Sequence, residues 1–344
     1  MGKKSQHFRI AIVIAGIFFV SFSYYVYQIL YTKNIQVNKD NKYLYIPTGA
    51  SFQTVLDSMS KDSMINDKVS FMFLAKLLGY RENVKPGKYL IEKNSSNLKV
   101  IRLLRSGRQE PVKLTFNSIR TKEDLVRKLS SKLEPSVEDF NKLLNDPEYC
   151  NKLGFDTNTI VSMFLPNTYE VYWNTSAEKF IERMKSEYEI FWNAERRKKA
   201  QEAGFNPVQV SILASIVEAE TNKDSEKARI AGVYINRLAT NMPLQADPTV
   251  KFALRDFEIK RITKEHIKTN SPYNTYMVNG LPPGPINLPS LKSIDAVLNY
   301  EKHKYLYFCA SAKRPGYHDF AENYRDHINN ANRYHTYLDN KNIK

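Results

Sequence analysis

The first pattern along the chain is a long apolar segment without a formal charge. Between Arg9 and Lys33, positions 10–32 are mostly Ile, Val, Phe, Tyr and Ala. At about 1.5 Å per residue, a helix of this length spans the roughly 30 Å hydrocarbon core of a bilayer. The run is too long for a cleaved signal peptide, and no small-residue cleavage site closes it. We expect a transmembrane helix at 10–32, preceded by a cytoplasmic N-terminus at 1–9 because basic residues precede it.

Strand and helix patterns then alternate over a short stretch, residues 43–116, which follows a polar segment at 34–42 that we interpret as a linker. Alternating or continuous apolar positions predict strands, and positions with helical spacing between cap residues and glycines predict helices. Strands are predicted at 43–46 and 111–116, and residues 85–91 are predicted to form a turn followed by a strand. The predicted helices are 51–60, 66–79 and 95–107. Because no cluster of titratable residues occurs here, we interpret this stretch as a small scaffold or recognition module.

Helical spacing dominates the rest of the chain, residues 117–340. A T-x-x-D capping box at Thr121 opens one predicted helix, and a long amphipathic helix is predicted at 176–203, where the charged residues suit a solvated face. The predicted fold class is therefore α+β. It consists of a single N-terminal transmembrane helix, a small α/β module and a larger, mixed helical domain.

One predicted helix, residues 207–220, ends in two glutamates. At about 100° per residue, Glu220 continues the apolar face of Ile216 and Val217, whereas Glu218 lies on the opposite side. Burial raises the pKa of a carboxyl group, as a general acid requires. A glutamate on an apolar face is more often a salt-bridged structural residue, and a frayed last turn would leave Glu220 in solvent. The helical pattern alone therefore leaves its role open.

Two irregular segments after this helix favour a binding surface. Residues 271–276 and 280–290 are rich in Asn, Thr, Tyr, Pro and Gly, a composition typical of ordered binding loops. Aromatic rings stack on the apolar faces of sugars, and amides hydrogen-bond to their hydroxyl groups. The structural alternative is a long connection that the prolines stiffen.

The composition adds charge but little specificity. The formal net charge of the 344 residues is +15, which suits nucleic acid, an anionic membrane surface or an acidic polymer without choosing among them. Lys and Asn are abundant, so part of the positive charge is also explained by the general amino-acid composition of the genome. Cys150 and Cys309 are far apart in the sequence, so a disulfide between them stays open. Without a C-x-x-C or H-E-x-x-H motif, the sequence indicates no metal and no cofactor.

Seven short motifs then carry a resemblance to a known family. They occur in order over residues 214–320: ASIVEAET, AGVYINRL, MPLQADPTV, SPYNTY, GLPPGPINLPS, YLYFCA and GYHDF. Together they resemble the YceG-like family, the endolytic murein transglycosylases. The apolar segment, the small module (LysM-like in that family) and the length also agree. The chain departs from the family at Asn167, where an aspartate is usual, and at residues 115–120, where a Glu-Gly pair is missing.

The resemblance implies a membrane-bound enzyme with an extracytoplasmic catalytic domain. It would cut the β-1,4 bond between MurNAc and GlcNAc inside nascent glycan strands, leave 1,6-anhydro-MurNAc ends and terminate elongation. Peptidoglycan strands and peptidoglycan synthases are the implied partners, and nucleic acid is not. The catalytic glutamate of the family falls on Glu220. One carboxyl group suffices because the 6-hydroxyl of the sugar is the nucleophile, whereas a hydrolase needs a second carboxylate.

Further site residues are predicted from chemistry and motif position. Glu218 either orients the site or faces solvent, and His318 in the GYHDF motif is a weaker candidate for the site lining. Asp247 is the nearest second carboxylate, although a cap or turn residue before Pro248 is the more common role. The predicted glycan contacts are Gln245, Asn274, Thr275 and Tyr276. A muramidase-type hydrolase that uses Glu220 and Asp247, or a non-catalytic peptidoglycan-binding scaffold, is the alternative function.

Overall fold

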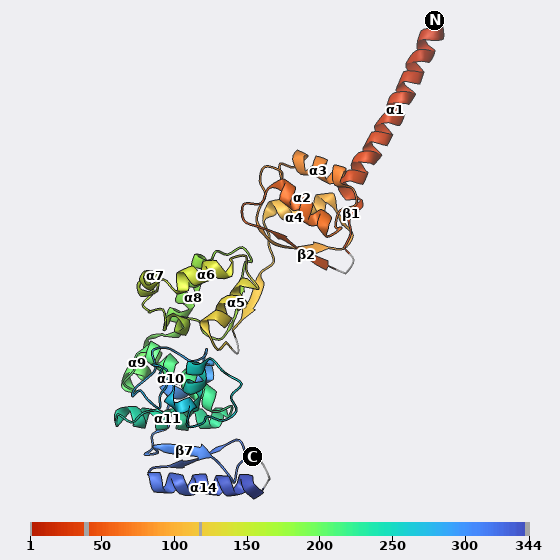
Figure 1. Ribbon diagram of the computed structural model, residues 1–344. Helices are drawn as coiled ribbons and strands as arrows, with labels where there is room; N and C mark the ends of the chain where they lie inside the picture. Colours follow the sequence, from red (N-terminus) through yellow and green to blue (C-terminus); the bar gives the residue numbers. More distant parts are fainter. Residues whose placement is uncertain (1, 38–40, 117–118, 341–344) are drawn as a thin grey trace. The chain divides into compact units, whose positions relative to one another are not determined.

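The computed structural model describes residues 2–37, 41–116 and 119–340 of the chain. The departure from the family at residues 115–120 therefore lies partly outside the described residues. The chain divides into two compact units. The first consists of Met1–Lys113, Lys132–Glu134 and Glu170–Thr175, and the second of the other residues. Helices and strands are mixed in the chain (Figure 1), which confirms the predicted α+β class.

The elements of the N-terminal part lie close to the predicted ones. In chain order they are α1 (Gly2–Tyr31), β1 (Lys33–Ile35), β2 (Asn41–Ile46), α2 (Phe52–Lys61), α3 (Lys68–Leu77), β3 (Gly87–Glu92), β4 (Ser95–Ser96), α4 (Asn97–Ser106) and β5 (Val112–Thr115).

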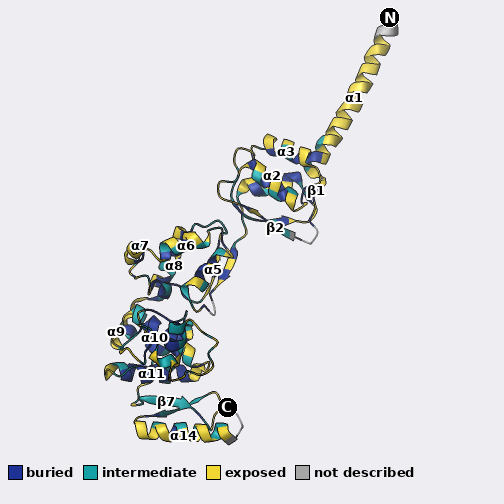
Figure 2. Cartoon of the chain, in the orientation of Figure 1, coloured by how far each residue is buried: buried dark blue, intermediate teal, exposed yellow. Residues whose placement is uncertain are grey.

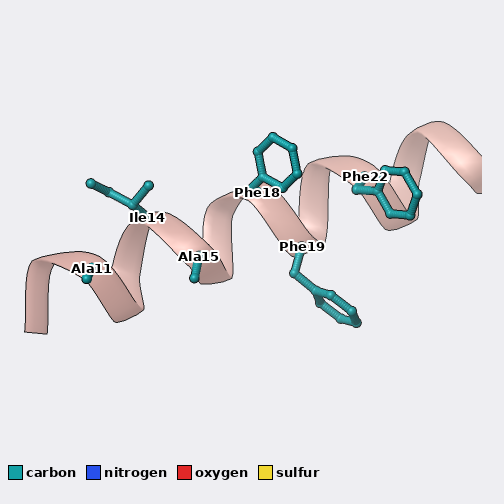
Figure 3. A pocket seen from close by; sticks show the side chains of 6 residues that line it. All are labelled: Ala11, Ile14, Ala15, Phe18, Phe19 and Phe22. Atoms are coloured by element: carbon teal, nitrogen blue, oxygen red, sulfur yellow. The ribbon is translucent and has the colours of Figure 1, made fainter. Parts of the chain in front are cut away.

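Helix α1 contains the predicted apolar segment. Its residues Ser5–Tyr31 are long and apolar enough to cross a membrane, and Figure 2 shows α1 exposed along almost its whole length. On this helix, Ile14, Phe18 and Phe22 project outward, and the small side chains of Ala11 and Ala15 leave a shallow hollow between them (Figure 3). An apolar helix that is exposed along most of its length is typical of a membrane anchor.

The linker predicted at 34–42 is wrong where its residues are described, because β1 includes residues 34 and 35 and β2 begins at Asn41; residues 38–40 lie outside the described part of the chain. Strand β1 pairs antiparallel with β4 and places Lys33 opposite Ser96. Ile35 and Val37 are buried, while Gln36 between them is exposed. Asn34 is buried as well, at 6% exposure, so these residues belong to the folded unit rather than to a linker.

The core of the first unit lies between one β-ribbon and three helices. Strands β2 and β3 pair antiparallel, with Leu44 opposite Tyr89. Leu44 and Ile46 are buried, whereas Tyr43 and Tyr45 are 42% and 44% exposed, so side chains of the strand alternate between the core and the surface. The buried cluster also includes Phe52 of α2, Phe71 of α3 and Ile101 of α4, and Ile29 at the end of α1.

The remaining elements are mostly helical. In chain order they are α5 (Lys122–Ser130), α6 (Val137–Leu144), α7 (Pro147–Lys152), η1 (Ile160–Met163), β6 (Thr168–Val171), α8 (Ala177–Phe191), α9 (Ala194–Glu202), α10 (Pro207–Glu220), α11 (Asp224–Ala239), α12 (Asp247–Leu254), η2 (His266–Lys268), α13 (Leu291–Leu298), β7 (Tyr307–Ala310), β8 (His318–Ala321) and α14 (Tyr324–Asn340). Strand β5 pairs with β6, and β7 pairs with β8.

The single helix predicted at 176–203 is wrong, because two helices, α8 and α9, occupy these residues. The backbone leaves the helical conformation at Trp192, whose side chain is fully buried. Asn193 then begins α9 by accepting a hydrogen bond from the Arg196 N–H on its side-chain oxygen. An asparagine that caps a new helix allows the chain to turn without unsatisfied N–H groups.

Helix α10 is the central element of the second unit. It is in contact with α9, α11, α12 and α13, and Figure 2 shows it buried for most of its length. Ser211, Ala214 and Ser215, expected on the opposite side from the apolar face, are also buried. The helix is therefore buried on all sides, and the position of a residue around it does not by itself decide exposure.

Candidate active site

The candidate active site begins at the C-terminal end of α10. Asn206 and Gln209 form a capping box, and Pro207 occupies the first turn, an arrangement that fixes the start of the helix. Glu220 is the last helical residue, because Thr221 has an extended backbone with φ of −145°. The carboxyl group of Glu220 therefore lies at the rim of the core, where the side chain is half-buried.

The surroundings of Glu220 favour its protonated form. Burial raises the pKa of Glu220 to about 7, and the negative charge of Asp247 adds to this rise. The Tyr234 O–H donates a hydrogen bond of 2.6 Å to Glu220 Oε1, which stabilises the carboxylate and lowers the pKa in opposition to burial. A carboxyl group with a pKa near neutrality can both donate and accept a proton.

Tyr234 and Arg237 lie one turn apart on α11, beside Glu220. The ring of Tyr234 is fully buried and packs edge-on against Phe308 at 5.9 Å between centroids. The guanidinium group of Arg237 donates hydrogen bonds of 2.7 Å to the carbonyl oxygens of Leu244 and Leu306. Arg237 therefore attaches α11 to the segment before α12 and to the residue before β7.

Glu218 lies in a different environment, with three donors around its carboxylate. Lys227 Nζ lies 3.0 Å from Glu218 Oε2, the Ser290 O–H donates to the same oxygen at 2.6 Å, and the Ser293 O–H donates to it as well. Burial alone would raise the pKa of Glu218, but these hydrogen bonds lower it below the ordinary value. Glu218 is thus a half-buried, charged group that joins α10 to α11 and α13, and it does not face open solvent.

Asp247 and Tyr276 form a pair near Glu220. Asp247 is the first residue of α12, is exposed, and accepts a hydrogen bond of 2.6 Å from the Tyr276 O–H. The helix cap is Ala246 rather than Asp247. The charge of Asp247 raises the pKa of Glu220, and the charges of Asp247 and Glu220 raise the pKa of Tyr276, so the structure brings these predicted residues together.

Two of the predicted glycan contacts are buried, so their contact with a glycan stays a prediction. Asn274 and Thr275 are fully buried, at 0% and 1% exposure. The Asn274 amide donates to the carbonyl oxygens of Ile267 and Thr269, and Thr275 Oγ1 accepts from the Ala246 N–H at 3.0 Å. Their polar groups are therefore used within the protein, and they hold the loop rather than offer donors to a ligand.

Gln245 differs from these two residues because its side chain is exposed. Its backbone adopts a left-handed conformation with φ of 51°, and its N–H donates to the Thr275 carbonyl oxygen at 3.0 Å. A non-glycine residue in this conformation is uncommon and is held by its surroundings. Contact of Gln245 with a ligand stays a prediction.

The predicted binding loop 280–290 packs largely against α10. Ser215 Oγ accepts a hydrogen bond from the Ile286 N–H at 3.0 Å, and the Asn287 amide donates to the Ser215 carbonyl oxygen at 2.8 Å. A Cβ atom at Gly284 would lie 2.5 Å from the Asn158 carbonyl oxygen, so the loop also approaches the backbone of another segment closely. Much of this loop therefore belongs to the core of the unit.

His318 has a structural partner in the same unit. Its backbone N–H and its Nδ1 atom each lie 3.0 Å from the carboxylate of Glu226, which is 3% exposed. This pair joins β8 to α11. Cys150 and Cys309 are both free thiols, and the described residues contain no group of three His, Cys, Asp or Glu side chains arranged for a metal ion.

Several residues of the site were not assigned from the sequence. The three-residue spacing of Tyr234 and Arg237 places both on one face of α11, a signal that could have been found. The Lys227, Ser290 and Ser293 donors to Glu218 come from two other helices, and no local spacing indicates them.

Comparison with known proteins identifies the family. A model of the YceG-like family matches residues 44–333. The chain belongs to the YceG-like family. The family predicted from the seven motifs is thereby confirmed.

Individual members agree over most of the chain. The endolytic murein transglycosylase of Bacillus subtilis (strain 168) is 27% identical over 307 residues, which cover 82% of this chain and 84% of that protein. The endolytic murein transglycosylase of Streptococcus pneumoniae serotype 2 (strain D39) is 26% identical, and the match covers 90% of this chain and 61% of that protein. The crystal structure of a YceG-like protein from Listeria monocytogenes aligns with a TM-score of 0.57 at 26% identity, covering 85% of this chain and 99% of that one.

Proposed function

We propose that the protein is a membrane-anchored, endolytic lytic transglycosylase of peptidoglycan. It cleaves the β-1,4 bond between MurNAc and GlcNAc within nascent glycan strands, leaves 1,6-anhydro-MurNAc ends and so terminates elongation. The observation that carries the proposal is the half-buried carboxyl group of Glu220, whose pKa is raised to about 7. The names of the similar transglycosylases support the same substrate.

Glu220 acts first as an acid and then as a base. Its protonated carboxyl group donates a proton to the glycosidic oxygen as the bond from that oxygen to C1 of MurNAc breaks. The resulting carboxylate then accepts the proton of the 6-hydroxyl group as O6 forms a bond to C1. Glu220 thereby regains the proton that it donated, and the reaction consumes no water. A pKa near 7 suits a group that performs both steps at neutral pH.

The neighbours of Glu220 position and tune it. Tyr234 holds Glu220 Oε1 in place through its hydrogen bond of 2.6 Å. Tyr276 and Asp247 lie on the loop and on α12 beside the carboxyl group, and with the exposed Gln245 they are the proposed glycan contacts. For Glu218 we propose an orienting role through α10, because three donors already use its carboxylate.

A muramidase-type hydrolase is the second candidate, and the closeness of Asp247 favours it. The charge of Asp247 contributes to the raised pKa of Glu220, so the two carboxyl groups are near enough to act on one substrate. The hydrogen bond from Tyr276 lies against this candidate, because it already occupies the Oδ1 atom of Asp247, which would have to accept a proton from water.

Product analysis separates these functions. Purified peptidoglycan is digested with the wild-type protein, with Glu220→Gln and with Asp247→Asn, and the products are examined by mass spectrometry. We expect anhydro ends from the wild type, none from Glu220→Gln, and anhydro ends at a reduced yield from Asp247→Asn. Reducing ends from the wild type would establish the hydrolase instead. Binding without any cleavage by the wild type would favour a non-catalytic scaffold.

The remaining parts of the chain suit this function at a membrane. We propose that α1 spans the cell membrane with its N-terminus in the cytoplasm, so that the catalytic unit is extracytoplasmic and works beside peptidoglycan synthases. The first unit contains the order β2, α2, α3, β3, which supports a LysM-like module that contacts glycan. The net charge of +15 favours approach to an anionic membrane and to carboxylate-bearing glycan. Protease protection of the two ends of the chain in sealed vesicles tests this topology.

A further inference from the structure

Helix α3 of the first unit carries an apolar stripe on its exposed face. The side chains of Val69, Phe73 and Leu77 are 74%, 58% and 69% exposed. They are four residues apart, so they lie on one side of the helix along about 12 Å. Phe71 and Leu74 are buried on the other side. A helix on the surface of a soluble module normally presents polar residues outward, so a continuous exposed stripe indicates an interaction surface.

The apolar stripe lies on a helix that is fixed to the end of α1. Asn97 is 1% exposed, and its amide donates both to the Ile29 carbonyl oxygen of α1 at 3.2 Å and to Ser70 Oγ of α3 at 3.0 Å. Ile29 belongs to the buried core of the unit, and α1 and α3 are in contact. Figure 1 shows α3 at the end of the first unit from which α1 leaves.

The connection between α1 and the rest of the first unit is short. Helix α1 ends at Tyr31, and β1 begins at Lys33. Asn34 of β1 accepts a hydrogen bond from the Asp67 N–H at 2.6 Å, and Asp67 is the cap residue of α3. The end of the apolar span is thus joined to the start of α3 by buried hydrogen bonds. If α1 crosses a bilayer, α3 is held at its surface.

We infer that the apolar stripe of α3 inserts into the membrane interface beside α1. Two exposed lysines, Lys68 and Lys76, lie at the start and near the end of α3, and neither forms a salt bridge among the described residues. Lysines of an interfacial helix extend their charged ends to lipid phosphates while the apolar face is buried among acyl chains. Lipid is the occupant that the structure favours, because α3 contacts α1 and lies at the end of the unit from which this apolar helix leaves (Figure 1). This inference rests on the membrane anchoring proposed above.

Spin labels in the full chain test the inference. After replacement of Cys150 and Cys309 by serine, single cysteines are introduced as Phe73→Cys and Leu77→Cys on the stripe. The variants are reconstituted into vesicles of phosphatidylethanolamine and phosphatidylglycerol. Collision rates with lipid-soluble oxygen and with a water-soluble nickel chelate are then measured by electron paramagnetic resonance. We expect the ratio of oxygen to nickel collisions at both positions to exceed that of a water-exposed label by roughly threefold or more.

Two further labels make the outcome decisive. Tyr43→Cys on β2, at the end of the unit away from α1 in Figure 1, is the water-exposed reference. Phe18→Cys on α1 reports the anchor. A deep label at position 18 with a water-exposed label at 73 and 77 overturns the inference and leaves the proposed function intact. A label shielded from both oxygen and nickel at 73 and 77 overturns it in favour of a protein partner. A water-exposed label at position 18 refutes the anchor and the inference together.

Discussion

Replacement of Tyr234 by phenylalanine is expected to shift the pH dependence of cleavage upward. The Tyr234 O–H donates to Glu220 Oε1 at 2.6 Å and opposes the effect of burial on the pKa of Glu220, which is about 7. A hydrogen bond to a charged group contributes about 1.5–3 kcal/mol, and one pKa unit corresponds to about 1.4 kcal/mol. Water can reach the half-buried carboxyl group and replaces part of the lost bond. We therefore expect the pKa of Glu220 to rise by about one unit.

The assay is the pH profile of kcat/KM on purified glycan strands. The first step of the proposed mechanism needs a protonated Glu220, so we expect the rate to decline at a pH above the pKa of Glu220, and kcat/KM reports that pKa in the free enzyme. This decline should begin near pH 7 in the wild type and about one unit higher in Tyr234→Phe. Tyr276→Phe is the matched control, because it removes a hydroxyl group that donates to Asp247 instead.

Two results would refute this reasoning. If kcat/KM of Tyr234→Phe declines at the same pH as that of the wild type, Tyr234 does not lower the pKa of the titrating group. An equal shift in Tyr276→Phe would assign the effect to the general surroundings rather than to the hydrogen bond. The ring of Tyr234 packs against Phe308, and phenylalanine keeps this contact, so unfolding does not confuse the comparison. Circular dichroism at each pH checks that both variants stay folded.

Three further predictions concern stability, measured by thermal unfolding. The pKa of Glu220 is raised from 4.5 to about 7 in the folded state, so the charge of Glu220 destabilises the fold as the pH rises through this range. Glu220→Gln should therefore raise the free energy of unfolding by about 1–2 kcal/mol at pH 8 and by much less at pH 5. Equal changes in Tm at the two pH values would contradict this prediction. Glu218→Gln should lower the free energy of unfolding by about 1–3 kcal/mol, because the side chain of Lys227 is 6% exposed and would keep, among the described residues, only Asp224 as a charged partner. An unchanged Tm would refute the role of Glu218 in joining α10 to α11. Gly232→Ala should lower stability by about 1–3 kcal/mol, since its Cβ would lie 2.4 Å from the Glu301 carbonyl oxygen; Ala239→Gly at the end of the same helix is a milder comparison, at about 1 kcal/mol.

Local patterns predicted most elements of the first unit because cap residues and alternation report local structure. Ser51, Asp67 and Ser96 cap α2, α3 and α4, and each marks a predicted helix start to within about two residues. The break between α8 and α9 was missed because the residues on both sides of Trp192 have helical spacing. The strand after α1 was missed because three residues with two buried side chains resemble a polar linker.

The site was predictable only in part, for a similar reason. Burial raises the pKa of Glu220, as predicted, but helix α10 is buried on all sides, so the argument from one apolar face was incomplete, and the catalytic role of Glu220 stays a prediction. Asn274 and Thr275 have the chemistry of glycan contacts, yet the backbone around them uses their polar groups. Composition indicates which groups a loop contains, whereas tertiary packing decides which of them remain available.

The two glutamates at the end of α10 illustrate how structure separates similar groups. Both side chains are half-buried, and the number of hydrogen-bond donors around each carboxyl group differs. Glu218 has three donors and a lowered pKa, whereas Glu220 has one hydrogen bond and a raised pKa. Environments that push two pKa values apart allow one group to stay charged while the other exchanges protons.

Glu218 also stabilises the last turn of α10, where Glu220 lies. The last residue of a helix is prone to fray, because its carbonyl groups lack partners within the helix. Glu218 lies two residues earlier and joins this final turn to Lys227 of α11 and to Ser290 and Ser293 at the start of α13. A carboxyl group that must approach a glycosidic oxygen within hydrogen-bond distance needs such a fixed support. In the proposed mechanism, the charged Glu218 therefore holds the helical turn from which the protonated Glu220 acts.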